Sequence, residues 1–201
     1  MRSKKIFTAV AAALLTMALS AGGTFAYFRY LKSINNRVSV GTNTITINED
    51  YSPPKKLEAG ENVYTKDVKV KNTGTIPCYV RVYAAFSDST VMDKSELSAD
   101  GNTFFPAGTY YENIPDGWAY VAEAEDPELG GYYYYTNPVQ AGKETPSLFK
   151  KVKTTFADAN EVQNYEIIVY AESVQILDKE GQEFTGATPW KSAWTEFLER
   201  K

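Results

Sequence analysis

Apolar and polar residues alternate along several short stretches of the chain, which is the period of a strand with one buried face. The first stretch covers residues 44–48, where Ile45 and Ile47 share one face. The second covers residues 64–72. A third follows Pro77 and places on one side Cys78, Val80, Val82, Ala84 and Phe86. The pattern therefore predicts three strands in the first 86 residues.

The pattern is weaker over residues 87–115. We interpret residues 95–100 as a short helix and residues 104–108 as an ordered loop with apolar anchors. Aromatic stretches at residues 118–122 and 131–136, bounded by Gly, Pro or Asp, predict two more strands separated by an acidic loop.

The last third adds two strands and a helix. In residues 148–156 the apolar residues Leu148, Val152 and Phe156 fall on one face, which predicts a strand. Residues 165–177 are apolar on both faces, which is typical of a central strand covered on both sides. A helix from Pro189 to about residue 198, with Thr188 as its cap, would carry an apolar stripe and supply one cover. The stripe consists of Trp190, Trp194, Phe197 and Leu198.

Many short strands with little helix predict an all-β fold, an antiparallel β-sandwich with a short C-terminal helix. Periodicity leaves two topologies open, the jelly roll and the immunoglobulin-like sandwich.

The first 26 residues have the three-part layout of a secretory signal peptide. A basic start precedes apolar residues 6–21, and the small residues Thr24 and Ala26 predict cleavage before Tyr27. The alternative is an uncleaved membrane anchor, but the apolar stretch is shorter than the roughly 20 residues needed to cross a bilayer.

Cleavage would leave residues 27–201 as a single sandwich domain with a free N-terminal segment at 27–37. It would also remove three positive charges and no negative ones, lowering the formal net charge from −4 to −7. An acidic chain without a basic stripe lacks the electrostatic footprint of a nucleic-acid-binding protein, so we expect no nucleic acid partner.

The chain contains no histidine and one cysteine, Cys78. The missing histidine excludes a Ser-His-Asp triad and a His-Glu-x-x-His zinc site. Without a base to generate a thiolate, Cys78 is interpreted as a small buried apolar residue. We therefore expect no catalytic residues, no metal site and no cofactor.

Three strings carry a resemblance to a known family. They are Gly-Gly-Thr-Phe-Ala-Tyr-Phe at residues 22–28, Val-Lys-Asn-Thr-Gly-Thr-Ile-Pro-Cys-Tyr-Val-Arg-Val at residues 70–82, and Val-Tyr-Ala-Glu-Ser-Val-Gln at residues 169–175. In this order they resemble the alternate-signal exported proteins of Gram-positive bacteria, which a SipW-type signal peptidase processes and which are related to TasA and camelysin. A clostridial-type branch of this group matches best.

The resemblance implies a TasA-like jelly roll, secretion, and participation in surface or biofilm-matrix fibres. Camelysin-like relatives are also classified as metallopeptidases, and the absence of histidine counts against that activity here.

The segment Tyr27, Phe28, Arg29, Tyr30 and Leu31 is the candidate assembly site. It is aromatic and β-prone, so it can add as a strand to the sheet edge of another subunit. The alternative is a terminus that is disordered or packs on its own domain.

Two other clusters offer binding chemistry. The tyrosines at 132–135 could stack on sugars, although alternation sends only half of them to each face, and a strand with tyrosines in core and surface is the more ordinary interpretation. Carboxylates at Glu123, Glu125, Asp126 and Glu128 could bind calcium, but no Asp-x-Asp-x-Asp loop is present and a solvated acidic loop is the alternative.

The sequence thus predicts a secreted structural protein of the cell surface or extracellular matrix. Its expected partners are copies of itself or related exported matrix subunits, and a SipW-type signal peptidase for processing. A monomeric extracellular ligand-binding module and a camelysin-like metallopeptidase are the alternatives.

Overall fold

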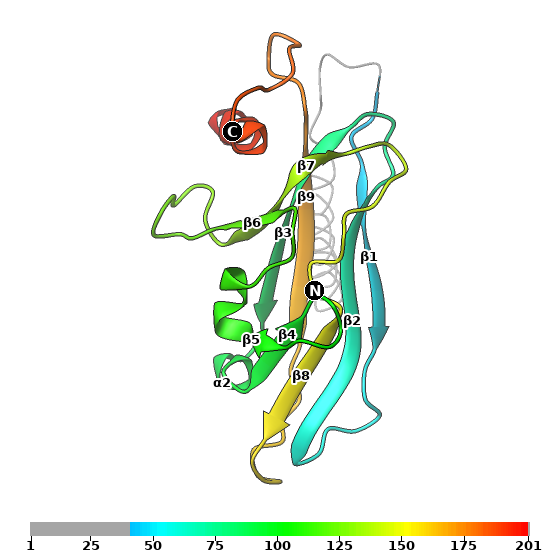
Figure 1. Cartoon of the computed structure of the whole chain (residues 1–201), viewed down its shortest axis with the longest axis vertical. Helices are drawn as coiled ribbons and strands as arrows, with labels where there is room; N and C mark the ends of the chain where they lie inside the picture. Colours follow the sequence, from blue (N-terminus) through cyan, green and yellow to red (C-terminus); the bar gives the residue numbers. More distant parts are fainter. Residues whose placement is uncertain (1–40, 201) are drawn as a thin grey trace, which may run out of the picture. The chain divides into compact units, whose positions relative to one another are not determined.

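A computed structural model describes residues 41–200 of the chain, which lie within one compact unit. They form two facing antiparallel sheets and a C-terminal helix (Figure 1). The predicted all-β sandwich with a short C-terminal helix is confirmed. The jelly-roll topology stays a prediction.

The first sheet contains five strands, and its longest strand lies second from one edge. The strand order is β1 (Ile45–Ser52), β2 (Gly60–Asn72), β8 (Lys151–Phe156), β4 (Ser95–Ser98) and β5 (Phe105–Pro106). Side chains of β2 alternate between buried and partly exposed from Asn62 to Asn72, as the period of the sequence predicts. Ile47 of β1 pairs with Val70 of β2, so the two apolar faces coincide.

The second sheet contains four strands in the order β6 (Trp118–Val121), β7 (Tyr132–Val139), β3 (Cys78–Phe86) and β9 (Ile167–Gln175). Strand β9 pairs with β3 along its whole length and has no partner on its other side among residues 41–200. The prediction of a central strand at residues 165–177 is therefore wrong, because β9 lies at an edge. Its outward residues Ile168 and Tyr170 are 49% and 40% exposed.

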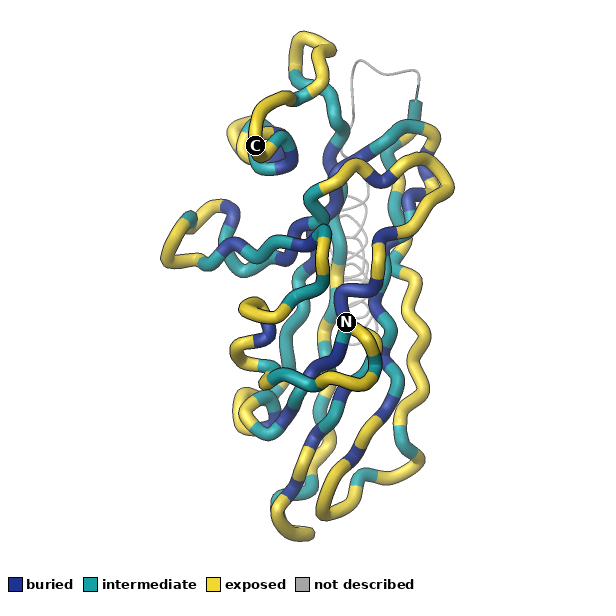
Figure 2. The backbone as a smooth tube through the Cα atoms, in the orientation of Figure 1, coloured by how far each residue is buried: buried dark blue, intermediate teal, exposed yellow. Residues whose placement is uncertain are grey.

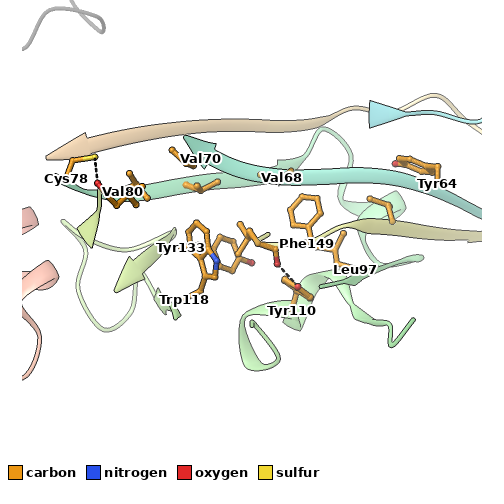
Figure 3. Close-up of a cluster of buried hydrophobic side chains, with 14 residues drawn as sticks. Tyr64, Val68, Val70, Cys78, Val80, Leu97, Tyr110, Trp118, Tyr133 and Phe149 are labelled. Carbon is orange, nitrogen blue, oxygen red and sulfur yellow. Dashed lines mark hydrogen bonds between the residues drawn. The ribbon is translucent and has the colours of Figure 1, made fainter. Parts of the chain in front are cut away.

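The main core fills the space between the two sheets (Figure 3). Inward residues of β2 and β3, such as Val68 and Val80, are completely buried. The Tyr110 hydroxyl donates to the Leu148 carbonyl at 2.7 Å, which satisfies a polar group inside the core. Figure 2 shows that buried residues recur along the strands of both sheets, whereas β1 is mostly exposed.

The helix predicted at residues 95–100 is also wrong. Residues 95–98 form β4 because they pair with β8, and the short helix α2 (Ser89–Met92) lies just before them. The carboxylate of Asp88 accepts the N–H groups of Thr90 and Val91 and caps this helix. The loop predicted at residues 104–108 contains β5 and the start of a 3₁₀ helix, η1 (Ala107–Glu112).

The C-terminal helix α3 (Pro189–Glu199) confirms the predicted helix. Thr188 occupies the N-cap position, but its side chain makes no cap hydrogen bond, so its predicted capping role is wrong. The helix buries Trp190 and Trp194 against the outer face of the second sheet, where they meet Tyr134 of β7. Within residues 41–200, no helix is long and apolar enough to cross a membrane.

Candidate functional site

The predicted cleavage residues Thr24 and Ala26 and the predicted assembly segment lie outside the described residues, so both stay predictions. The assembly segment comprises Tyr27, Phe28, Arg29, Tyr30 and Leu31. The described chain enters the sandwich beside the end of β9. There Ser173 donates its hydroxyl to the Asn43 side-chain oxygen at 2.9 Å, and the Asn43 amide donates to the Ser173 carbonyl at 3.3 Å.

The open edge of β9 carries backbone groups without partners among residues 41–200. The Ser173 carbonyl accepts Asn43 on the side of β9 that faces away from β3. In a strand, the backbone N–H and C=O groups of alternate residues point to the same side. The groups of Ile167, Val169 and Ala171 therefore point to the same open edge, where they can receive an added strand.

Strand β1 also has an open edge, and it contacts β9 on the same side of the sandwich. Its inward face carries a charge: Glu49 forms an ion pair with the buried Lys66, whose ammonium lies 4.9 Å from the centre of the Tyr51 ring. Inward-pointing charges are a common protection of edge strands against unwanted pairing. The inward residues of β9 from Ile167 to Ser173 carry no charge, so β9 is the edge better suited to accept a strand.

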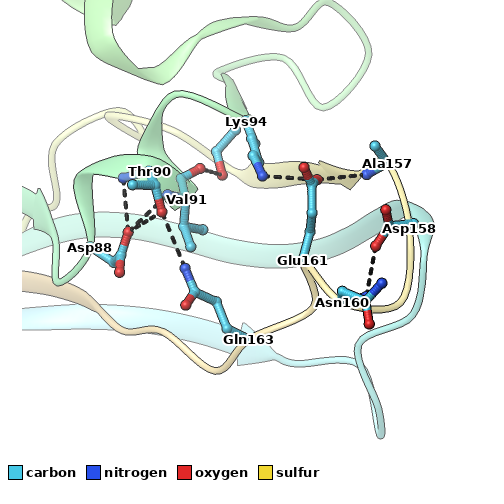
Figure 4. A network of polar contacts seen from close by, with 10 residues as sticks. Asp88, Thr90, Val91, Lys94, Ala157, Asp158, Asn160, Glu161 and Gln163 are labelled. Carbon is cyan, nitrogen blue, oxygen red and sulfur yellow. Dashed lines mark hydrogen bonds and ion pairs between the residues drawn. The ribbon is translucent and has the colours of Figure 1, made fainter.

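The start of β9 is fixed to the rest of the molecule by polar contacts (Figure 4). In the preceding loop, Glu161 pairs with Lys94 at 2.8 Å. Gln163 donates to the hydroxyl of Thr90, which lies within α2, at 3.3 Å. These contacts tie the loop that precedes β9 to α2 and to the residue before β4.

The tyrosines of β7 split between the two faces, as alternation predicts. Tyr133 packs in the main core, whereas Tyr134 is buried under α3. Tyr132 points outward, and its hydroxyl lies 2.5 Å from that of Tyr170 on β9. The ring of Tyr170 also stacks on Tyr83 at 5.1 Å between ring centres. The exposed aromatic surface of this sheet is therefore made by three strands and not by the tyrosine run alone.

Arg81 forms a buried polar centre on the outer face of the second sheet. Its guanidinium binds Glu172 of β9 with N–O distances of 2.7 and 2.5 Å. It also lies 3.9 Å from the ring centre of Tyr132 and 4.4 Å from that of Trp194. Burial by itself lowers the pKa of Arg81, but the Glu172 carboxylate and the Tyr134 hydroxyl together raise it above its ordinary value. Arg81 thus joins β3, β9 and α3.

The acidic loop is organised by Asp126. One of its carboxylate oxygens accepts the N–H groups of Glu128 and Leu129 at 3.2 Å, and the other lies 3.7 Å from the ammonium of Lys191 on α3. No group of three or more acidic, cysteine or histidine side chains within residues 41–200 is placed to hold a metal ion. The calcium hypothesis for Glu123, Glu125, Asp126 and Glu128 therefore gains no support from the structure.

Cys78 lies in the main core, and its thiol is 4.0 Å from the Val139 carbonyl oxygen. Burial raises the pKa of this thiol to about 12. A thiolate nucleophile is not available at neutral pH under these conditions. The interpretation of Cys78 as a small buried apolar residue is confirmed.

Two features that define this site have no local signature in the sequence. The edge position of β9 depends on which strands pair, and no local pattern encodes it. The Arg81–Glu172 pair joins residues 91 positions apart, so spacing gave no signal for it.

The structure defines a β-sandwich protein in which, within residues 41–200, the edge strand β9 has a free side and no charge on its inward face, and no metal or nucleophile site is assembled. A family model described as camelysin metallo-endopeptidase matches residues 2–104. The match covers half of the chain, and the chain belongs to this family. The resemblance to camelysin-related and TasA-related proteins is thereby confirmed at the level of the family. None of the curated proteins compared with the chain matches it.

The family description implies a catalytic metal, which the donor groups of this chain do not fit. Catalytic zinc in peptidases is held mainly by histidine, and the whole sequence contains none. The described carboxylates do not converge on a common point either. No catalytic step through a metal follows from these residues.

Proposed function

We propose that the chain is an exported structural protein of the cell surface or extracellular matrix that assembles by strand addition. The N-terminal segment at residues 27–31 of one copy would pair with the open edge of β9 in the next copy. The observation that carries this proposal is the edge of β9, whose outward backbone groups have no partner among residues 41–200 and are flanked by half-buried apolar side chains.

Strand addition at this edge is physically favourable for two reasons. The incoming backbone supplies partners for the N–H and C=O groups of Ile167, Val169 and Ala171. Successive side chains of the added strand point to opposite faces, so Phe28 and Tyr30 share one face. Aromatic side chains on that face would cover apolar surface that β9 leaves open to water.

Two finer assignments belong to the same proposal. The strings at residues 22–28, 70–82 and 169–175 support a place in the clostridial-type, SipW-processed branch of the family. A SipW-type signal peptidase would then cleave after Ala26 and free the assembling strand. Secretion and a non-enzymatic role follow from this proposal.

The first test compares three purified forms of the chain by size-exclusion chromatography and negative-stain microscopy. One form begins at Tyr27, the second carries a blocking extension on that residue, and the third lacks residues 27–35. We expect concentration-dependent polymers from the first form only. Polymers of equal length from the deleted form would refute strand donation, and monomers from all three would favour a monomeric ligand-binding module.

The second test changes the acceptor edge. Val169→Pro removes one N–H group that faces the open edge, and it spares the ladder with β3 because that ladder uses the neighbouring residues. Val169→Thr keeps the N–H group and the branched shape, and it serves as the matched control. We expect the proline variant to fold but not polymerise, whereas the threonine variant polymerises. Normal polymers from a folded proline variant would place the acceptor elsewhere.

The family description favours a metallopeptidase as the second candidate. This function predicts cleavage of casein-like substrates that a chelator abolishes and added zinc restores. We expect no such cleavage, because the chain lacks histidine ligands. Chelator-sensitive turnover by the purified chain would reverse the order of the two candidates.

A further inference from the structure

A surface cleft of about 460 Å³ lies beside β2, away from both the β9 edge and helix α3. Lys69 of β2 lines one side of the cleft, and the turn after β4 lines another with Asp100. Pro115, Pro146 and Lys150 lie in the segments before β6 and β8 and complete the wall. The cleft thus combines a mainly apolar lining with charged groups.

The charges of the cleft leave ammonium groups available to a ligand. Lys150 forms no ion pair with any of residues 41–200. Lys69 binds Asp67 at 2.8 Å, and an ammonium has three donors, so two of them remain. Lys151 adds a third positive charge near the turn, because its side chain lies about 3.6 Å from the position of a Cβ on Gly101.

The acidic residue of the cleft is already occupied. One oxygen of Asp100 accepts the backbone N–H groups of Asn102 and Thr103 at 2.7 Å and the Ser98 hydroxyl at 2.9 Å. The other accepts the Thr103 hydroxyl at 2.9 Å. These bonds, the one from Asn102 foremost, hold the pKa of Asp100 well below its ordinary range. Asp100 therefore stays ionised, and its oxygens are already occupied by hydrogen-bond donors of its own turn.

Ser147 supplies the second observation that points to a ligand. The residue is 7% exposed, lines the cleft, and its hydroxyl has no hydrogen-bond partner among residues 41–200. The Ser147 oxygen is not one of the fully buried unpaired atoms of residues 41–200, so it reaches solvent where the residue lines the cleft. A ligand hydroxyl that enters the cleft can replace water as its partner.

The cleft offers side chains and no free backbone edge. The backbone of residues 148–150 is already hydrogen-bonded to its neighbours. The Val68 N–H donates to the Phe149 carbonyl, the Val68 carbonyl accepts the Leu148 N–H, and the Lys150 N–H donates to the Ser98 carbonyl at 2.7 Å. A peptide would therefore find no strand edge to extend at these residues, in contrast to the edge of β9. The cleft suits a compact ligand that carries a carboxylate, hydroxyl groups and an apolar ring face.

We propose that this cleft binds a hexuronate unit of an acidic polysaccharide. The uronate carboxylate binds Lys150 and the free donors of Lys69, and a ring hydroxyl binds Ser147. The C–H face of the sugar packs on Pro115 and Pro146. Since the cleft is open to solvent, a sugar residue in the middle of a polysaccharide chain can bind in it, and the end of the polysaccharide does not have to pass through the cleft.

The test titrates the full-length mature chain with glucuronate and follows its amide chemical shifts by NMR. Glucose, which lacks the carboxylate, and acetate, which lacks the ring, are the matched ligands. We expect glucuronate to bind with a Kd on the order of millimolar and about tenfold more tightly than either control. Acetate that binds as tightly as glucuronate, or glucuronate that shifts no resonance of the cleft, would overturn the proposal.

Variants separate binding from folding. Lys150→Glu should weaken glucuronate binding at least about tenfold, whereas Lys55→Glu makes the same charge change on an exposed loop and should leave it intact. Ser147→Ala should keep the melting temperature, because it removes a hydroxyl without a partner, yet weaken binding severalfold. Unchanged affinity in the Lys150 variant would overturn the proposal. Polymerisation in the same samples reports separately on the assembly proposal.

Discussion

Replacing Glu172 with alanine should destabilise the protein more than any ordinary surface substitution. The change leaves the Arg81 guanidinium, which is 4% exposed, without its carboxylate partner. A charge in such a place cannot recover its lost hydration, so the folded state is penalised directly. The prediction concerns the free energy of unfolding of the chain.

The structure sets the size of this effect. Removing one partner of a buried ion pair costs about 3–5 kcal/mol. Glu172 is 26% exposed, so water can reach the vacated position, and Arg81 keeps the Tyr134 hydroxyl and two aromatic rings. These features favour the lower end, about 3 kcal/mol, which corresponds to a fall of roughly 6–12 °C in Tm for a domain of this size.

The assay is urea unfolding followed by tryptophan fluorescence, which reports on Trp194 beside the ion pair. Glu180→Ala, on an exposed loop, is the matched control and should change stability by less than about 0.5 kcal/mol. The double replacement Arg81→Met with Glu172→Leu should return stability to within about 1 kcal/mol of the parent, because apolar side chains can fill the site. A loss below about 1 kcal/mol in Glu172→Ala would refute the reasoning.

Asp100→Asn should make the stability of the protein depend less on pH in the acid range. The pKa of Asp100 is held low in the folded state, so as the pH falls the unfolded chain takes up a proton at this carboxylate before the folded chain does. The contribution of Asp100 to the free energy of unfolding is therefore present above about pH 4 and is lost progressively below it. Tm measured across this range should fall more steeply in the parent, and parallel curves would contradict the prediction. Tyr165→Phe should cost about 1–3 kcal/mol, because the Tyr165 hydroxyl links those of Tyr64 at 2.8 Å and Thr154 at 2.7 Å. An unchanged thermal melt would contradict it. Cys78 should react with a thiol reagent at pH 8 only when urea unfolds the chain, because burial shields the thiol and raises its pKa. Rapid labelling of the native protein would contradict this prediction.

The sequence predicted strands well where one face is buried and the other exposed. In β2 and β3 the apolar face meets the opposite sheet, so period-two alternation survives in the sequence and identifies both strands. The sequence predicted helix α3 equally well, because its apolar stripe has the helical period and the helix begins at Pro189.

The failures have a common cause, which is tertiary pairing. Residues 95–98 are short enough to form a turn of helix locally, but pairing with β8 makes them a strand. The apolar outer residues of β9 indicated burial on both faces, yet α3 covers only the end near Val174 and leaves Ile168 exposed. The lysines and the serine of the cleft come from segments that converge only in three dimensions, so no motif marks them.

The position of β8 has a consequence for how the chain becomes ordered. This strand joins β2 to β4, and without it the first sheet is divided into the β1–β2 ribbon and the two-residue pairing of β4 with β5. Contacts between distant parts of the sequence are slow to form, because loop closure must precede them. A chain that ends before Lys151 therefore leaves the first sheet in two unconnected parts, although β3, β6 and β7 of the second sheet are already present. Ordering of the first sheet must wait until about three quarters of the polypeptide is available.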